Sequence, residues 1–303
     1  MGGMFDVGDK PDTQRTAVAQ AILRVEPATI RLIKEGKSPK GDIVDAAKIA
    51  ATMGAKRTPD LIPYCHPIPI DNVKVDISLK EESIEVTIQV KSIWKTGVEM
   101  ESLTAACIAV LTIYDMLKPV DESLSIESVR LVKKRGGIKE FYHEFDRELK
   151  AAVLVMSDSR GSKEDQSGKL VMERLKENGF NVVDYKVISD EAEIIESELK
   201  RCADELKVDI VLTSGGTGLG PRDVTPEATM KVIEKDVSGV SEVLRAHGQR
   251  RTPLSMLSRG VTGVRGNTVI VNLPGSAKAV SESLDSLFPG ILHIYRMLGG
   301  YGH

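Results

Sequence analysis

The sequence has few of the features that mark several common protein classes. Only 4% of its 303 residues are aromatic, too few for rows of side chains that stack on nucleic-acid bases. Its 41 basic and 44 acidic residues give a net charge of −3, so a strongly basic surface is not expected. The most apolar stretch, residues 105–114, is far shorter than the ~20 residues of a membrane span. We therefore expect a protein that binds neither nucleic acid nor membranes.

Cysteine is also scarce, which excludes a disulfide framework. Cys65, Cys107 and Cys202 are an odd number without paired spacing, as expected for reduced thiols in a cytosol. Cys65 precedes His66, but no second ligand pair lies nearby in the sequence, so structural zinc is disfavoured. The N-terminus shows no basic patch followed by a long apolar run, the pattern of a secretory signal. These features predict a cytoplasmic protein.

The length and a change of pattern predict two domains, residues 1–147 and 148–303. In the first half, alternating strands and separate helices predict an α+β domain. The expected helices are residues 27–35, 42–54 and 98–117, and the expected strands are residues 73–79, 84–90 and 126–132. The short charged junction, residues 142–150, indicates a joint between the domains and not a flexible tether.

The second half alternates strands with helices, which predicts an α/β three-layer domain with a mostly parallel sheet. The expected strands are residues 151–156, 181–188, 208–212 and 268–273. The expected helices are residues 167–178, 191–206, and two that begin near residues 225 and 276. Ser167 and Thr225 are the expected caps of two of these helices.

In the first half, cations, a histidine and carboxylates are predicted at the ends of elements. They are Lys40, Lys56, Arg57, His66, Glu99, Asp115, Lys118 and residues 133–135. Each alone is most simply a solvated lysine, a packed histidine or a surface ion pair. Together they suit a phosphate-bearing substrate, which needs several fixed cations and groups that move protons.

The spacing of two carboxylates makes a prediction about assembly. Glu99 and Asp115 are sixteen residues apart, which is about 24 Å on one continuous helix. They cannot both touch one small substrate within a single chain. If both belong to one active site, a neighbouring subunit completes it.

Several segments of the first half resemble the MoaC family, cyclic pyranopterin monophosphate synthase of molybdenum cofactor biosynthesis. They are MFDV at residues 4–7, KGD at 40–42, AKRT at 55–58, DLIPYCHP at 60–67, KTGVEME at 95–101 and LTIYDM at 111–116. The resemblance covers residues 4–138. It implies a ferredoxin-like α+β subunit in a hexamer of dimers, with active sites at the dimer interfaces. It also implies rearrangement of a cyclised dihydro-GTP into a pterin with a cyclic phosphate, with loss of pyrophosphate.

The resemblance assigns roles to residues of this sequence. Asp115 and Lys118 would be catalytic, with Lys40 and His66 as further candidates. The remaining substrate-site residues would be Tyr64, Cys65, His66, Glu99 and Met100, with Lys56, Arg57 and Lys134 at the triphosphate. Two departures affect the loop after the last strand: Ile138 follows the Gly-Gly pair where a lysine is usual, and Arg135 replaces a usually small residue.

In the second half, a glycine-rich loop follows an expected buried strand. Residues 213–220 (TSGGTGLG) lack both the Walker A sequence and the Rossmann spacing. Glycines here let backbone amides approach a phosphate, although a tight turn that merely packs is an equal alternative. Asp190 and Asp223 are expected at the same sheet edge, where they would bind Mg²⁺ or cap helices.

Four segments of this half resemble the MogA/MoaB family, whose active members are molybdopterin adenylyltransferases. They are ISDE at residues 188–191, SGGTG at 214–218, RDVTP at 222–226 and NLPGS at 272–276. The resemblance covers residues 150–298 and implies transfer of AMP from ATP to molybdopterin with Mg²⁺, typically in a trimer. Asp190 and Asp223 match the catalytic acidic positions. The residues implied at phosphate and pterin are Ser214, Gly215, Gly216, Thr217, Gly218, Pro274, Gly275 and Ser276.

Both halves thus resemble enzymes of one pathway, which predicts a bifunctional protein of molybdenum cofactor biosynthesis. It would act on phosphorylated purine and pterin small molecules. A hexamer and a trimer share three-fold symmetry, so both domains fit one homo-oligomer. Two alternatives remain open for the second half: a molybdopterin-binding module without catalysis, and an unrelated nucleotide-binding α/β module.

Overall fold

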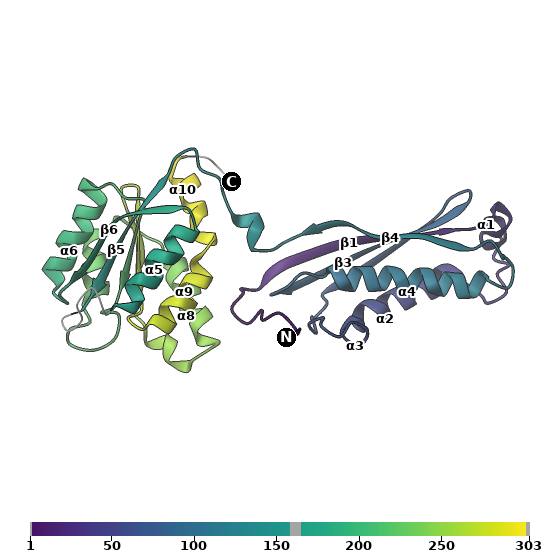
Figure 1. Cartoon of the computed structure of the whole chain (residues 1–303), viewed down its shortest axis with the longest axis horizontal. Coiled ribbons are helices and arrows are strands. Elements are labelled where there is room, and N and C mark those ends of the chain that lie inside the picture. Colours follow the sequence, from purple (N-terminus) through teal and green to yellow (C-terminus); the bar gives the residue numbers. More distant parts are fainter. Residues whose placement is uncertain (1, 158–164, 301–303) are drawn as a thin grey trace. The chain divides into compact units, whose positions relative to one another are not determined.

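The computed structural model describes residues 2–157 and 165–300, with the side chains of all of these except residues 138 and 139. Contacts within the chain divide it into two compact units, residues 1–140 and 141–303 (Figure 1). We call them the first and the second unit.

Residues 141–147, which the sequence analysis assigns to the first domain, belong to the second unit. Phe145 packs against the core of the second unit, and its ring makes an edge contact with Tyr295. Arg147 forms an ion pair with the buried carboxylate of Asp209, whose Oδ2 also accepts a hydrogen bond from Lys150 N at 2.7 Å. The expected joint is therefore tied to the second unit by packing and charge.

The first unit is a four-stranded antiparallel sheet with helices along one face (Figure 1). Its elements are β1 (Thr13–Arg24), α1 (Pro27–Lys34), α2 (Ile43–Lys56), α3 (Thr58–Leu61), β2 (Asn72–Leu79), β3 (Ser83–Trp94), α4 (Glu99–Leu117) and β4 (Ser125–Arg135). The strand order is β2-β3-β1-β4. A short 3₁₀ turn, Ile138–Phe141, follows β4. The α+β class predicted for this half is observed.

The sequence pattern did not predict β1, one of the two central strands of this sheet. It pairs with β3 on one side and β4 on the other. The buried side of β1 is mostly alanine, at Ala17, Ala19 and Ala21, so its alternation of apolar and polar side chains is weak. Burial alternates along β1 and β3 but not along the edge strand β4.

Helix α4 is the main core element over this sheet. By length and composition alone it could cross a membrane, but 56% of its apolar window is buried within the unit. It contacts β1, β3 and α2. Ala105, Ala106 and Ala109 are fully buried on it, and such small side chains permit close packing against neighbouring elements.

The second unit has three layers around a six-stranded sheet of order β6-β5-β7-β10-β9-β8. Its strands are β5 (Leu149–Met156), β6 (Phe180–Ile188), β7 (Ile210–Ser214), β8 (Lys235–Asp236), β9 (Thr262–Arg265) and β10 (Thr268–Leu273). Its helices are α5 (Gln166–Glu177), α6 (Ala192–Lys200), α7 (Thr225–Val232), α8 (Ser238–Gln249), α9 (Ala277–Leu287) and α10 (His293–Leu298). Short 3₁₀ segments lie at Pro253–Leu257 and Gly290–Leu292.

The mostly parallel sheet predicted for this half is confirmed. Strands β6, β5, β7 and β10 are parallel. At one edge β9 pairs antiparallel with β10, and β8 pairs antiparallel with β9. Helices α5 and α9 share one core cluster, whereas α6 and α7 share another. The sequence analysis did not identify β8, β9 or α8.

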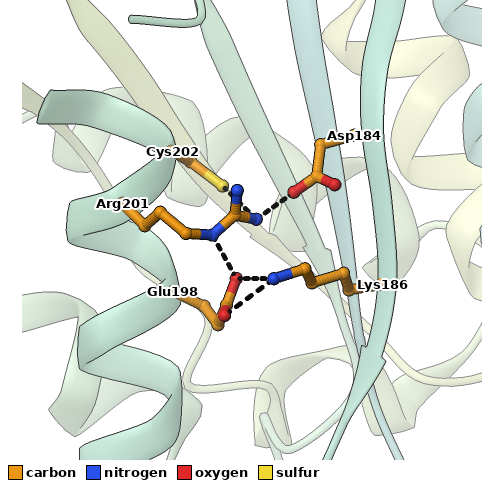
Figure 2. Close-up of polar contacts among 5 residues, drawn as sticks. All are labelled: Asp184, Lys186, Glu198, Arg201 and Cys202. Carbon is orange, nitrogen blue, oxygen red and sulfur yellow. Dashed lines mark hydrogen bonds and ion pairs between the residues drawn. The ribbon is translucent and has the colours of Figure 1, made fainter. Parts of the chain in front are cut away.

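Helix α6 continues into a single π-helical turn, Arg201–Glu205, and is tied to β6 by a charged network (Figure 2). The guanidinium of Arg201 bonds the carboxylates of Asp184 and Glu198, and Lys186 Nζ lies 2.9 Å from Glu198 Oε1. Burial raises the pKa of the neighbouring Cys202 thiol to about 11, so this thiol stays protonated. All three cysteines are free, as expected.

Candidate functional site

In the first unit, the candidate residues lie in two groups at opposite ends of α4. At its C-terminal end, Asp115 is held between two lysines. Lys118 Nζ lies 2.8 Å from Asp115 Oδ1, and Lys40 Nζ lies 2.7 Å from Oδ2. Lys40 also donates to the carbonyl oxygen of Asp115 at 2.9 Å. All three side chains are exposed, so their two ammonium groups are available to an anion.

These contacts favour the ionised forms of Asp115 and Lys118. The hydrogen bond from Lys118, followed by that from Lys40, lowers the pKa of Asp115 to about 2. The same hydrogen bond raises the pKa of Lys118. The group therefore carries two positive charges and one negative charge at neutral pH, a net positive site of the kind that phosphate-bearing substrates need.

The second group surrounds the N-terminal end of α4. Lys134 Nζ, on β4, lies 3.2 Å from Glu99 Oε1. Arg15 of β1 is 8% exposed and donates to the carbonyls of Trp94 and Lys95 at 3.3 Å. Burial lowers the pKa of Arg15, and the charge of Glu99 opposes this shift. The sequence analysis missed Arg15 because it lies on the strand that was also missed.

Glu101 is a further member of this group that the sequence analysis did not assign. Its side chain is 1% exposed, and its Oε1 accepts a hydrogen bond from the Cys65 thiol at 3.4 Å. Burial raises the pKa of both side chains, to about 11 for Cys65. The buried Oε2 has no hydrogen-bond partner among the described residues. In the sequence, only its place in the KTGVEME segment pointed to Glu101. Its spacing did not, because a carboxylate two residues from Glu99 lies on another face of the helix.

The other candidates of the first unit are placed by α2, α3 and α4. Met100 is 39% exposed and Tyr64 is 65% exposed, whereas His66 is half-buried. Lys56 and Arg57 are exposed at the C-terminal end of α2. Helix α2 runs antiparallel to α4, because Lys40 lies beside Asp115 while Gly54 packs on Ala105 and Ile108. This direction turns the end of α2 away from Lys40 and Asp115.

Helix α4 is continuous from Glu99 to Leu117, as the sequence spacing requires. Its rise of about 1.5 Å per residue puts Glu99 and Asp115 about 24 Å apart. One chain therefore does not bring its two groups of candidate residues to one small substrate.

In the second unit, the glycine-rich loop follows β7 as predicted. Gly215 and Gly216 have φ of +106° and +64°, in the region that favours glycine. A Cβ on Gly216 would lie 2.3 Å from Thr225 Oγ1, and one on Gly215 would lie 2.8 Å from the Met156 carbonyl. Thr225 Oγ1 also donates to the Gly215 carbonyl at 3.1 Å. Thr225 is therefore the first residue of α7 and holds the loop, whereas the N-cap position belongs to Val224.

The loop borders a cavity of about 490 Å³ that contains both predicted acidic residues. Asp190 follows β6 and Asp223 precedes α7, and several of the predicted substrate residues join them. The polar and glycine residues that line the cavity include Ser157, Asp165, Asp190, Ser214, Gly215, Gly216, Gly220, Arg222, Asp223 and Gly275. Neither Asp190 nor Asp223 is the N-cap of the adjoining helix, since Glu191 and Val224 hold those positions. The helix-capping alternative is therefore wrong.

Asp165 is a third carboxylate on this cavity, which the sequence analysis missed. It is the N-cap of α5, where Ser167 was expected, and it accepts hydrogen bonds from Gly168 N and from the Ser167 hydroxyl. Tyr185 donates to its Oδ2 at 2.8 Å. Although burial raises the pKa of Asp165, these hydrogen bonds lower it overall. Burial, followed by the same hydrogen bond, raises the pKa of Tyr185 to about 12.

The structure divides the predicted phosphate and pterin residues between two cavities. Pro274 and Ser276 line a second cavity of about 260 Å³, together with Arg245, Asn272 and Glu282. The Ser214 hydroxyl, on the first cavity, donates to the Pro274 carbonyl at 3.0 Å and so joins the two sides. Thr217 and Gly218 line neither of these two cavities.

The donors on the larger cavity fit a magnesium ion shared with a nucleotide. Mg²⁺ is commonly held by one or two carboxylates together with substrate phosphates. Asp190 and Asp223 provide two carboxylates on one cavity beside the glycine-rich loop. In the described part of the chain, no three His, Cys, Asp or Glu side chains gather as a complete metal cage.

Comparisons with known proteins agree with this division into two units. The sequence pattern of the MoaC family matches residues 4–137, and that of the probable molybdopterin binding domain matches residues 152–293. Half of this chain matches the crystal structure of the molybdopterin biosynthesis enzyme MoaB from Thermus thermophilus, with 42% sequence identity. The match covers 50% of this chain and 97% of that chain, and the TM-score is 0.47.

Two relatives match both units at once. The chain is 40% identical over 304 aligned residues to a molybdenum cofactor biosynthesis bifunctional protein of Chlorobaculum tepidum, covering 99% of this chain and 96% of the relative. It is 36% identical to the protein of the same name from Synechococcus elongatus, covering 99% and 98%. At this identity and coverage, the chain belongs to the family of molybdenum cofactor biosynthesis bifunctional proteins.

Proposed function

We propose that the two units catalyse two separate steps of molybdenum cofactor biosynthesis. The first unit converts a cyclised dihydro-GTP to cyclic pyranopterin monophosphate with release of pyrophosphate. The second unit transfers AMP from ATP to molybdopterin. The observation that carries the proposal is the presence of both sites on one chain whose full-length relatives are named bifunctional.

The cations of the first unit would bind the phosphates of its substrate. Lys40 and Lys118 present two ammonium groups, each held by one carboxylate oxygen of Asp115, and Lys118 remains protonated because its pKa is raised. A protonated lysine beside a substrate is a general acid. Around the other end of α4, Lys134, Lys56 and Arg57 would meet the triphosphate, and Tyr64, Cys65, His66, Glu99 and Met100 would line the site.

We further propose that each site of the first unit is completed by a second subunit. The separation of about 24 Å between Glu99 and Asp115 supports this, since two antiparallel copies of α4 would bring unlike ends together. The strand order β2-β3-β1-β4 supports a ferredoxin-like subunit, and so does a β-α-β-β-α-β plan in which α1, α2 and α3 together connect β1 to β2. A hexamer or a trimer would satisfy both units.

In the second unit, the phosphate of molybdopterin would attack the α-phosphorus of ATP in line, and pyrophosphate would leave. Asp190 and Asp223 would hold Mg²⁺ with the ATP phosphates, and the ion would neutralise the charge that develops there. Backbone amides of residues 214–218 would hold phosphate oxygens in place. Pro274, Gly275 and Ser276, between the two cavities, would meet the pterin.

The test is a pair of product assays on the whole chain with two matched variants. Lys118→Ala should lower the synthase activity about 10²–10⁴-fold and leave adenylylation unchanged, since a positioned proton donor contributes that much. Asp223→Ala should do the reverse. A wild-type chain that forms only one product, or a variant that lowers both activities equally at unchanged melting temperature, contradicts the proposal.

A second candidate function for the second unit is molybdopterin binding without catalysis. The description of the matched family as a probable molybdopterin binding domain favours it. Two carboxylates on the cavity oppose it, because simple binding of a phosphate would be stronger without them. Molybdopterin bound by the chain but left unmodified in the presence of ATP and Mg²⁺ would establish the second candidate.

A further inference from the structure

One arginine outside the predicted site holds the segment that carries Asp223. Arg259 follows the 3₁₀ segment Pro253–Leu257, and its side chain is half-buried. Its Nε donates to the Gly218 carbonyl at 2.7 Å, and its Nη2 donates to the carbonyl of Asp223 itself. The guanidinium therefore links the two ends of the segment 218–223.

Two more contacts hold the arginine and the loop to each other. The backbone N–H of Arg259 donates to the Thr217 carbonyl at 3.0 Å. Its Nη1 forms an ion pair with Glu227 in the first turn of α7. Burial raises the pKa of Glu227, but the bond from Arg259 lowers it overall, so this carboxylate stays charged.

Contacts with the Asp223 carboxylate also restrict the segment 218–223, and two of its positions have room only for glycine. Gly220 N donates to Asp223 Oδ2 at 2.7 Å, and a Cβ on Gly218 or Gly220 would lie within 2.9 Å of that oxygen. The carboxylate is thus aimed by the path of residues 218–223, and that path is set at both ends by one planar group. A guanidinium offers five N–H donors in a fixed fork, which lysine cannot reproduce.

We propose that Arg259 is a positioning residue of the second unit, which fixes the Asp223 carboxylate on the cavity by bonding the carbonyls of Gly218 and Asp223. The role of Arg259 in catalysis rests on the proposed adenylylation. Its role in holding residues 218–223 does not, because the hydrogen exchange of these residues can be measured without substrate.

The test compares Arg259→Ala, Arg259→Lys and Glu227→Gln in the whole chain. Hydrogen exchange of residues 218–224 should become at least about tenfold faster in Arg259→Ala, the change that loss of one charged hydrogen bond produces. In the adenylylation assay, kcat should fall about 10- to 100-fold, as for other groups that orient a metal ligand, with an unchanged KM for molybdopterin.

The other two variants separate positioning from general stabilisation. Arg259→Lys keeps the charge but replaces the planar fork with a single ammonium group, so it should restore part of both readouts. Glu227→Gln leaves both carbonyl bonds in place, and its amide oxygen can still accept a hydrogen bond from Arg259, so both readouts should stay close to those of the wild type. Unchanged exchange in Arg259→Ala, or an equal loss of kcat in Glu227→Gln, would overturn the proposal. If the wild type forms no adenylylated product, the proposed function fails, and the exchange measurement alone decides the role of Arg259.

Discussion

The two units present charge to their substrates in different ways. In the first unit, Lys40, Asp115 and Lys118 are exposed side chains at one end of a helix, and the remaining candidates lie near its other end. In the second unit, Asp190 and Asp223 line one cavity beside a loop of glycines. A single chain thus brings the candidate carboxylates of the second unit to one cavity, but it leaves the two candidate groups of the first unit at opposite ends of α4.

This difference follows from the architecture of each unit. A doubly wound sheet gathers the carboxyl ends of its strands at one edge, so residues that follow β6 and β7 meet in one place. An antiparallel sheet covered by a long helix has no such edge, and its polar groups fall at both ends of the helix. One chain can therefore build the proposed site of the second unit, whereas each proposed site of the first unit combines residues of two chains.

Among the changes that test this difference between the units, the largest effect is expected on the glycine loop of the second unit. Gly216→Ala places a methyl group 2.3 Å from Thr225 Oγ1 at a φ of +64°. We expect about 100-fold slower adenylylation, because a misplacement of about 1 Å at a site has that consequence. The synthase activity should not change, since this loop belongs to the other unit.

Gly179→Ala is the matched control for this substitution. It has a φ of +82° but open space around its Cβ. Its backbone strain should cost about 1–2 kcal/mol of unfolding free energy without loss of adenylylation. If Gly216→Ala and Gly179→Ala destabilise the chain equally and neither slows adenylylation, the loop has only a packing role. The second unit would then not use this loop in its site.

The next effect tests whether the first unit shares its sites. Glu99→Ala and Asp115→Ala chains, each inactive alone, should regain about a quarter of the synthase activity when they are co-assembled. Half of the random pairs combine unlike chains, and each such pair has one intact site of two. The measurement is product formation after the two chains are unfolded and refolded together.

A second mixture controls for non-specific rescue. Asp115 and Lys118 lie at the same end of one helix, so Asp115→Ala and Lys118→Ala chains share no intact site in any pairing. This mixture should stay inactive. Equal activity in both mixtures, or none in either, would argue that each chain builds its whole site.

Much of this comparison could be predicted from sequence where local signals are strong. The span of α4 was predictable from its apolar character, and its length gave the separation of Glu99 and Asp115. The glycine loop and both acidic residues were predictable because a buried strand leads directly into glycines. The family resemblance of both halves is confirmed by relatives that span the chain.

Most of the failures have one physical cause, which is that tertiary contacts decide them. Strand β1 buries alanines, whose weak alternation gives no local signal for the centre of a sheet. Asp165 caps α5 in place of Ser167, and Arg259 holds a loop that ends 36 residues earlier. The partners of Arg259 are far from it in sequence, so no spacing rule connects them. The choice of Asp165 over Ser167 as the cap is local and depends on the residue at which α5 begins.

The smallest expected effect concerns the exposed ion group of the first unit. The pKa of Asp115 is lowered to about 2, mainly by its hydrogen bond from Lys118. A carboxyl with a depressed pKa stabilises the fold above its unfolded value of about 3.9, and this contribution disappears as the pH falls through the folded pKa. Because the side chains are exposed, the change in stability should be small, and the titration itself is the better measurement.

We therefore expect the Asp115 carboxyl, followed by NMR, to titrate near pH 2 in the wild type and closer to its ordinary value in Lys118→Met. Lys40→Met should shift the midpoint less, since the hydrogen bond from Lys118 is the larger cause. Lys48→Met, which removes an ion pair elsewhere in the unit, should leave it unchanged. An Asp115 that titrates alike in all four chains would mean that the lysines do not hold it, and the first unit would then lack a fixed cationic site.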